Sequence, residues 1–200
     1  MRIGAVVLAA GRSRRMGSEK VLLPFGGSTM LGTVLATLES AGVERHATAV
    51  VLRPDLAGAA AIVSAAGAGA VFNREPGAEM MSSIRLGLEA LPPELDAVFV
   101  WPADHPAVSL ETVRVLASGA DARTARIPCW NGRRGHPALL GRELRADALA
   151  CPDDGGLREL WRARADAVVE VPVEDPGIVA NADTPEEYEA ALRIWIEANR

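Results

Sequence analysis

Residues 5–20 read Ala-Val-Val-Leu-Ala-Ala-Gly-Arg-Ser-Arg-Arg-Met-Gly-Ser-Glu-Lys. The short apolar run from Ile3 to Leu8 contains β-branched residues and predicts a buried strand of a parallel sheet. The chain then enters a segment that holds two glycines, three arginines and one lysine. Glycines let backbone N–H groups approach a phosphate closely, and cations hold its charge. A strand that runs into a cationic glycine loop therefore predicts a triphosphate-binding site.

Lys20, at the end of this loop, is the only lysine of the sequence. Its compact, mobile ammonium differs from the planar fork of arginine, which suggests a specific role; the alternative is an ordinary solvated loop residue. The spacing excludes two common phosphate loops. G-x-x-x-x-G-K-[ST] fails because Val21 follows the lysine, and G-x-G-x-x-G fails because Ser13 stands where the second glycine would be.

Length and composition predict one globular domain over residues 1–200, with 49% apolar and 24% charged residues. The net charge of −5 argues against a nucleic-acid or membrane-surface binder, whereas the basic cluster at 12–20 favours a small anion. We expect a cytoplasmic protein on three grounds. The two cysteines lack C-x-x-C spacing, the N-terminus shows no signal-peptide pattern, and no apolar run is long enough to span a membrane.

Strand and helix patterns alternate along the chain. Short apolar runs predict further strands at 47–52, 70–72, 97–101, 124–130 and 167–171. Helical patterns are found between Ser28, a candidate N-cap, and Gly42, and over 56–66, 84–91, 109–118, 155–164 and 185–196. The last helix begins with a capping box and carries a predicted buried stripe that ends at Ile196. The alternation predicts an α/β, Rossmann-like three-layer fold with a mostly parallel mixed sheet.

Two aspartates could complete a nucleotide site. Ligands of such sheets bind beyond the carboxyl ends of the strands, where the 9–20 loop and Asp104 are both expected. Asp104 and Asp183 are candidate Mg²⁺ ligands, because Mg²⁺ takes one or two carboxylates together with phosphate oxygens. The alternatives are a turn aspartate and a helix-dipole partner, respectively. Two carboxylates and a cationic loop are what nucleotidyl transfer from an NTP–Mg²⁺ complex requires.

Other polar residues have less specific signals. Ser82 and Ser83 precede a helix, where they could bind a phosphate or act as caps; a serine hydrolase is excluded because G-x-S-x-G is absent. His136 could donate to a substrate oxyanion or simply pack within its loop. His105 is expected to be a partly exposed turn residue and His46 a surface residue.

Leu8–Lys20 matches the pattern L-A-A-G-x-S-x-R-M-G-x-x-K at every fixed position. This stretch resembles the signature loop of the molybdenum cofactor cytidylyltransferase family. Four further segments resemble family elements. Segment 102–106 resembles the D-x-P element and segment 135–137 the G-H-P element. Segment 153–158 resembles the G-D-x-G-A-R element and segment 181–186 the D-x-D-T-P-E element.

The resemblance implies a nucleotide-diphospho-sugar transferase-like fold and a reaction in which CTP and molybdopterin give a cytosine dinucleotide cofactor and pyrophosphate. It also implies Mg²⁺ as cofactor and a molybdoenzyme as a possible client. The implied catalytic residues are Lys20 and Arg15, the nucleotide contacts Leu8, Ala9, Ala10, Gly11, Arg12 and Ser13, the metal ligands Asp104 and Asp183, and the acceptor contacts Ser82, Ser83 and His136.

The base and the acceptor remain open at this point. Guanylyl relatives usually read L-A-G-G, so the methyl group of Ala10 favours cytosine over a purine. Glu79, Met81, His105 and Asn181 depart from the family pattern, mainly where the acceptor is expected. The alternatives are GTP or another phosphorylated acceptor, and a nucleotide-binding chaperone without catalysis. Isoprenoid-pathway cytidylyltransferases fit less well because their loop has a longer gap and a proline before the lysine.

Overall fold

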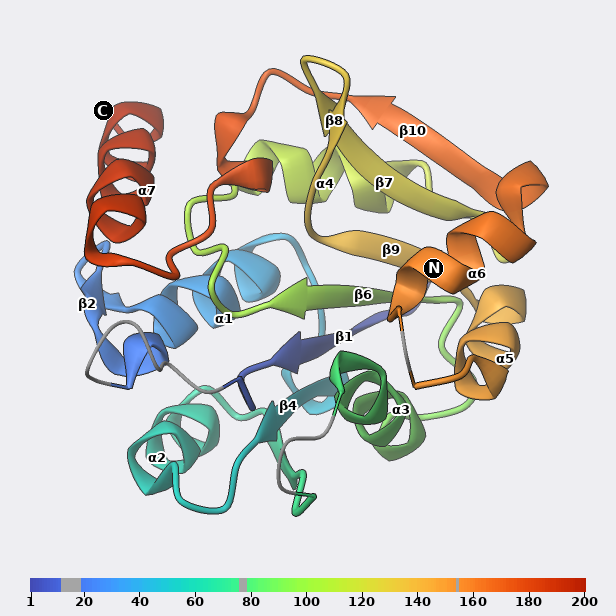
Figure 1. The fold of residues 1–200 in the computed structure, drawn as a ribbon, viewed down its shortest axis with the longest axis horizontal. Helices are drawn as coiled ribbons and strands as arrows, with labels where there is room; N and C mark the ends of the chain where they lie inside the picture. Colours follow the sequence, from blue (N-terminus) through green and yellow to red (C-terminus); the bar gives the residue numbers. More distant parts are fainter. Residues whose placement is uncertain (12–18, 76–78, 154) are drawn as a thin grey trace.

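The computed structural model describes residues 1–11, 19–75, 79–153 and 155–200. Within these ranges, eight strands form one sheet in the order β5-β4-β1-β6-β9-β7-β10, with β8 paired to β7 (Figure 1). The strands are β1 (Ile3–Leu8), β4 (Thr48–Leu52), β5 (Gly69–Phe72), β6 (Ala97–Pro102), β7 (Ala125–Trp130), β8 (Arg133–Arg134), β9 (Ala138–Gly141) and β10 (Val168–Pro172).

The sheet is mixed but mostly parallel. β1 runs parallel to β4 and β6, whereas β9 runs antiparallel to β6 and β7. The predicted α/β fold is therefore confirmed. The chain leaves β1 for β4 and β5 on one side and later returns to β6 on the other side. This reversal of strand order lies between β1 and β6, and ligands of such sheets bind beyond the carboxyl ends of the strands at such a point.

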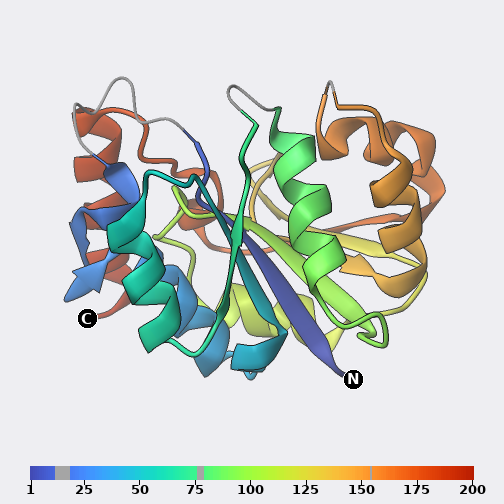
Figure 2. The same cartoon turned by 90° about the horizontal axis from the view of Figure 1, so that it is seen from below.

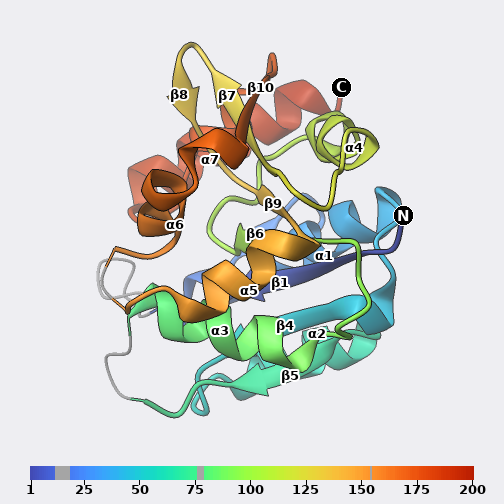
Figure 3. The ribbon, with the colours of Figure 1, turned by 90° about the vertical axis from the view of Figure 1, so that its right-hand side faces the viewer.

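Helices cover both faces of the sheet (Figures 2 and 3). One face carries α1 (Met30–Ser40), α2 (Ala57–Ala65) and α4 (Leu110–Ser118), and the other carries α3 (Met80–Ala90), α5 (Arg142–Ala150) and α6 (Leu157–Ala163). The last helix, α7 (Pro185–Ala198), packs against a small hairpin of β2 (Pro24–Phe25) and β3 (Ser28–Thr29). Every helix in the described ranges is too short or too polar to cross a lipid bilayer.

The apolar run of β1 is buried because both of its faces are covered by helices. Successive side chains of a strand point to opposite faces, so Val7 packs in the α1 layer and Val6 packs under α3. Gly87 of α3 lies directly on this strand, where an added Cβ would be 2.3 Å from Cγ1 of Val6. Close packing of α3 on β1 therefore requires a glycine at position 87.

Two helix details differ from the prediction. Thr29, not Ser28, is the N-cap of α1, because the Thr29 hydroxyl accepts a hydrogen bond from the N–H of Gly32 at 3.0 Å. Ile196 is 41% exposed and does not belong to the buried stripe of α7. Each residue turns about 100° around a helix, so Trp195 reaches the ring of Phe25 while its neighbour Ile196 points away.

The sequence patterns do not predict β9, α5 or the β2–β3 hairpin. β9 has four residues and no periodicity that separates a strand from a loop. α5 buries only Leu144 and Ala148, so few apolar positions mark it in the sequence. The hairpin turns on Gly26 and Gly27, whose φ angles of 60° and 81° are accessible to glycine at little cost.

Asp175 joins the segment η4 (Pro176–Val179) to the start of α4 and is 6% exposed. One carboxylate oxygen accepts from the N–H of Ser109 at 2.9 Å and the hydroxyl of Thr112 at 2.7 Å, and the other accepts from the N–H of Gly177 at 2.8 Å. Asp175→Ala leaves these buried donors unpaired. We expect it to lower the free energy of unfolding by about 2–4 kcal/mol in urea titrations.

Asp166 provides the matched control, because its side chain is 82% exposed. Asp166→Ala should change the free energy of unfolding by less than about 0.5 kcal/mol. An equal loss in the two variants would show that the hydrogen bonds of Asp175 add nothing beyond a general effect of removing an acidic group.

Candidate active site

Lys20 meets both predicted metal ligands at one point. It is the first residue of the short helix η1 (Lys20–Leu22), and its side chain is 9% exposed. Its Nζ donates to Oδ2 of Asp104 at 2.7 Å and to Oδ1 of Asp183 at 2.6 Å. Three residues from distant parts of the sequence therefore converge beyond the carboxyl ends of β1 and β6.

The backbone around Asp104 is held by the two central strands. The N–H of Ala103 donates to the carbonyl of Leu8 at 2.9 Å, which ties the end of β6 to the end of β1. The indole of the buried Trp101 donates to the carbonyl of His105 at 3.1 Å and closes the turn around Asp104. The carboxylate is thus presented by a rigid turn, while its side chain stays 25% exposed.

Asp183 is held by the start of α7. The predicted capping box is confirmed: the hydroxyl of Thr184 accepts from the N–H of Glu187, and the carboxylate of Glu187 accepts from the N–H of Thr184. The same Glu187 carboxylate also accepts from the N–H of Asp183 at 3.0 Å. Asn181, a departure from the family pattern, donates from its amide to Oδ2 of Asp183 at 3.0 Å. These bonds orient the carboxylate toward Lys20.

The electrostatics of this cluster favour a further cation. Burial alone would lower the pKa of Lys20, but the nearby carboxylates of Asp104 and Asp183 outweigh it and hold that pKa above its usual value. Lys20 therefore stays protonated at neutral pH, and one ammonium faces two carboxylates. Oδ1 of Asp104 is buried and has no hydrogen-bond donor among the residues described here.

These features fit a magnesium-type site. An acceptor oxygen of Asp104 remains available, and carboxylate oxygens are the ligands that Mg²⁺ prefers. In the described ranges, no three His, Cys, Asp or Glu side chains converge as a complete ligand set. The remaining ligands of a metal held by Asp104 and Asp183 would therefore come from water and from the phosphates of a substrate.

His105 and His136 form a buried pair beside Asp104. Their ring centroids are 4.7 Å apart, and Nε2 of His105 lies 3.9 Å from Oδ1 of Asp104. His105 lies in a turn and is partly exposed, as predicted: its side chain is 13% exposed, and the ring of His136 packs against it. The backbone N–H of His136 donates to the carbonyl of Ile178, which brings the predicted acceptor contact close to the Lys20 cluster. His46 is exposed, as predicted.

The pKa of His136 is lowered to about 4, mainly by burial and also by the neighbouring His105. In the unfolded chain the imidazole of His136 takes up a proton near its ordinary pKa of about 6.5. The free energy of unfolding is therefore highest above that pH, as far as His136 contributes, and falls as the pH drops toward 4. The loss should reach about 3 kcal/mol at most. We expect His136→Gln to flatten this part of a curve of unfolding free energy against pH, recorded in urea without divalent metal. An unchanged slope would contradict the assignment.

The predicted nucleotide contacts lie at the end of β1. The N–H of Ala9 donates to the carbonyl of Val51 at 2.9 Å, which extends the pairing of β1 with β4. Ala10 packs in the α3 layer, and Gly11 is exposed. Three of the predicted residues fall outside the described ranges: Arg12, Ser13 and Arg15.

The alternative that Ser82 or Ser83 caps α3 is wrong. The helix begins at Met80, and both serines lie in its first turn. Instead, the amide of Asn73 donates to the two hydroxyls at 2.8 and 3.0 Å. Asn73 is 5% exposed and follows β5 directly. Sequence reasoning missed it, although its place after a strand is the same signal that singled out Asp104.

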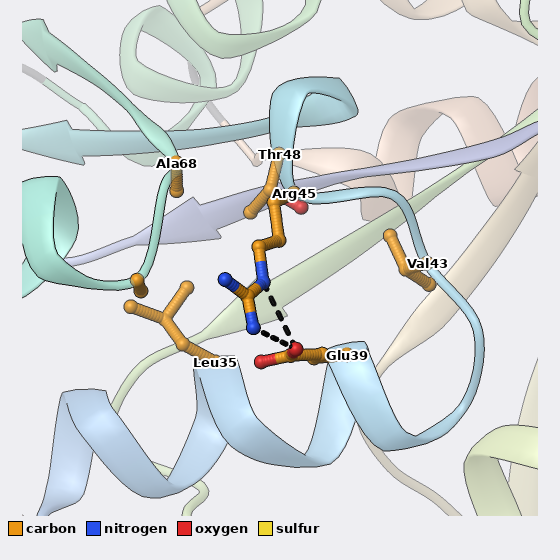
Figure 4. Close-up of a pocket in the computed structure, with 7 residues that line it drawn as sticks. Leu35, Glu39, Val43, Arg45, Thr48 and Ala68 are labelled. Carbon is orange, nitrogen blue, oxygen red and sulfur yellow. Dashed lines mark hydrogen bonds and ion pairs between the residues drawn. The ribbon is translucent and has the colours of Figure 1, made fainter.

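A small cavity lies at the amino end of β4, the end opposite to the Lys20 cluster (Figure 4). Arg45 and Glu39, which form an ion pair, are among the residues that line it. Its volume of about 10 Å³ suits at most one water molecule. This cavity is therefore separate from the Lys20 cluster and too small for a nucleotide.

Comparison with solved structures supports the fold. A nucleotidyl transferase from Methanothermobacter thermautotroptrophicus superposes with a TM-score of 0.85, at 28% identity and with 99% of each chain covered. Rv0371c from Mycobacterium tuberculosis, solved in complex with manganese, gives a TM-score of 0.79 at 25% identity, covering 96% of this chain and 99% of that chain. The CTP complex of CMP:2-keto-3-deoxy-manno-octonic acid synthetase has a TM-score of 0.73 at 17% identity, covering 98% of this chain and 99% of that chain. The predicted nucleotide-diphospho-sugar transferase-like fold is thereby confirmed.

Comparison of sequences identifies the family. A molybdenum cofactor guanylyltransferase from Rhodobacter capsulatus is 32% identical over 96% of this chain and 95% of its own length. A molybdenum cofactor cytidylyltransferase from Escherichia coli is 23% identical over 98% of both chains. Residues 5–168 match the MobA-like NTP transferase domain. Because that match spans most of the sequence and includes Lys20 and Asp104, the chain belongs to the MobA-like NTP transferase family.

Proposed function

We propose that this nucleotidyltransferase moves CMP from CTP to the terminal phosphate of a molybdopterin-type acceptor and releases pyrophosphate, with Mg²⁺ as cofactor. The observation that carries the proposal is the contact of the Lys20 ammonium with both carboxylates, Asp104 and Asp183. A cation between two potential metal ligands, at the point where the strand order of the sheet reverses, suits a triphosphate complexed with a divalent metal.

Each group has a defined task in this reaction. A phosphate oxygen of the acceptor attacks the α-phosphorus of CTP, and the bond from that phosphorus to the bridging oxygen of pyrophosphate breaks. Lys20 stabilises the negative charge that develops on the transferred group and on the leaving pyrophosphate. Asp104 and Asp183 would hold Mg²⁺, which supplies charge neutralisation and alignment of the phosphates.

Two observations bear on the identity of the base. Ala10 stands where guanylyl relatives usually have a glycine, and its additional methyl group supports cytosine over a purine. The 32% identity to a guanylyltransferase supports GTP as the second candidate. The acceptor would lie toward His136 and the first turn of α3. Asn73 donates to the hydroxyl oxygens of Ser82 and Ser83, so their protons can point to an anionic acceptor.

A panel of CTP, GTP, ATP and UTP with Mg²⁺ and molybdopterin, read by pyrophosphate release, tests the proposal. CTP should give the highest kcat/KM. A preference for GTP would overturn the base assignment and keep the reaction. Release with another phosphorylated acceptor and none with molybdopterin would overturn the acceptor. Tight binding of a nucleotide without release with any acceptor would indicate a nucleotide-binding chaperone.

A further inference from the structure

Arg53 contacts Gly11 and Glu19, the two described residues that flank segment 12–18. It is the first residue after β4, and its side chain is 13% exposed. Its Nη1 donates to the carbonyl of Gly11 at 2.7 Å, and its Nη2 donates to the two carboxylate oxygens of Glu19 at 2.7 and 2.9 Å. Its Nε donates to Asp55 at 2.9 Å, so all three guanidinium nitrogens are engaged.

These contacts differ from those of an ordinary surface ion pair. An exposed pair is worth little because water solvates both partners, whereas the Arg53 side chain is largely covered. The planar guanidinium offers several donors in fixed directions, which lets one side chain hold a carbonyl and a carboxylate together. The backbone of Arg53 is also fixed, because β4 pairs with β1 from Ala5 to Leu8 (Figure 1).

Arg53 can affect the reaction through Lys20, the residue that follows Glu19 in the chain. Glu19 directly precedes Lys20, and the carbonyl of Glu19 accepts the N–H of Leu22 at 2.9 Å at the start of η1. A Glu19 side chain held by Arg53 therefore fixes where η1 begins and where the Lys20 ammonium is presented. Arg53 sets this position relative to Gly11 at the end of β1.

We propose that Arg53 is a positioning residue for the nucleotide: it holds Gly11 and Glu19 at a fixed separation, so that Lys20 is ready for the triphosphate at the end of β1. This inference rests on the proposed function. A side chain that is already in position lowers the ordering cost of nucleotide binding. Loss of Arg53 should therefore weaken nucleotide binding more than it slows the chemical step, since Lys20 and both aspartates remain.

The test compares Arg53→Met, Arg53→Lys and Glu19→Gln with Arg45→Met. Arg45 is the matched control, because it is also paired with a glutamate but precedes β4, at the end of that strand opposite to Arg53 (Figure 4). The dissociation constant of CTP with Mg²⁺ is measured by calorimetry, kcat by pyrophosphate release, and stability by urea unfolding. Arg53→Met should raise the dissociation constant about 10-fold and change kcat by no more than about threefold.

Arg53→Lys should not rescue binding, because one ammonium cannot hold both ends with the same geometry. Glu19→Gln is the milder change and should raise the dissociation constant in the same direction. The double variant Arg53→Met/Glu19→Gln should be no worse than Arg53→Met alone, because the two residues act as one unit. Arg45→Met should leave nucleotide binding unchanged.

Three results would overturn the inference: a dissociation constant within twofold of wild type in Arg53→Met, full rescue by lysine, or a loss in Arg45→Met as large as in Arg53→Met. Should Arg53→Met not fold, unchanged binding in Glu19→Gln would overturn it as well. Failure of the proposed function gives different results, which are read in the wild type. A wild type that binds NTPs but releases no pyrophosphate would overturn the proposed reaction and leave the role of Arg53 in binding to be judged by its variants. A wild type that binds none of the four NTPs with Mg²⁺ would overturn both proposals.

Discussion

Asp104→Asn should lower kcat for nucleotidyl transfer by about 100-fold or more. Asparagine keeps the size of the side chain but removes the charge that attracts a divalent metal and pairs with Lys20 at 2.7 Å. It also replaces a carboxylate whose buried Oδ1 accepts no hydrogen bond from the described residues. The measurement is pyrophosphate release at saturating nucleotide, which separates the loss in kcat from a change in KM.

Asp166→Asn is the matched control, since it makes the same chemical change on a side chain that is 82% exposed. It should retain the activity of the wild type. Higher concentrations of Mn²⁺ should restore part of the activity of Asp104→Asn if the loss comes from weaker metal binding. A kcat within about threefold of wild type in Asp104→Asn would remove Asp104 from the catalytic site.

Lys20→Met should have two opposite effects. It should lower kcat by about 100-fold, because a cation that stabilises the developing phosphate charge is lost. It should also tighten the binding of Mn²⁺ in the absence of nucleotide, by about 10-fold or more, because the ammonium no longer competes for Asp104 and Asp183. Paramagnetic resonance titration of Mn²⁺ measures the second effect independently of turnover.

Lys20→Arg separates charge from shape. It keeps the positive charge, so its affinity for Mn²⁺ should stay near that of the wild type, whereas its kcat should fall because a planar guanidinium cannot replace a compact ammonium. Wild-type Mn²⁺ affinity in Lys20→Met would mean that Asp104 and Asp183 do not form the metal site. The expected pattern implies that metal and nucleotide bind together, because the phosphates draw Lys20 away as the carboxylates accept the metal.

Local patterns predicted most of the fold. The apolar runs of β1 and β6, the amphipathic helices and the capping box at Thr184 depend on neighbours a few residues away in the chain. Such features can be seen in the sequence because hydrophobic period and backbone capping are local properties. The elements that the sequence patterns missed, such as β9 and α5, are short and bury few residues. Their structure depends on packing against the rest of the sheet.

In the candidate site, too, some features could be predicted from the sequence and others only from the tertiary structure. Lys20, Asp104 and Asp183 stand out in the sequence because each follows a recognisable element or motif, but only the tertiary structure shows that one ammonium meets both carboxylates. Arg53 and Asn73 carry no motif, and their roles come from long-range partners such as Glu19 and the first turn of α3. Side-chain contacts across the sheet depend on strand order and on loop paths. These are set by packing over the whole chain, so no local pattern encodes them.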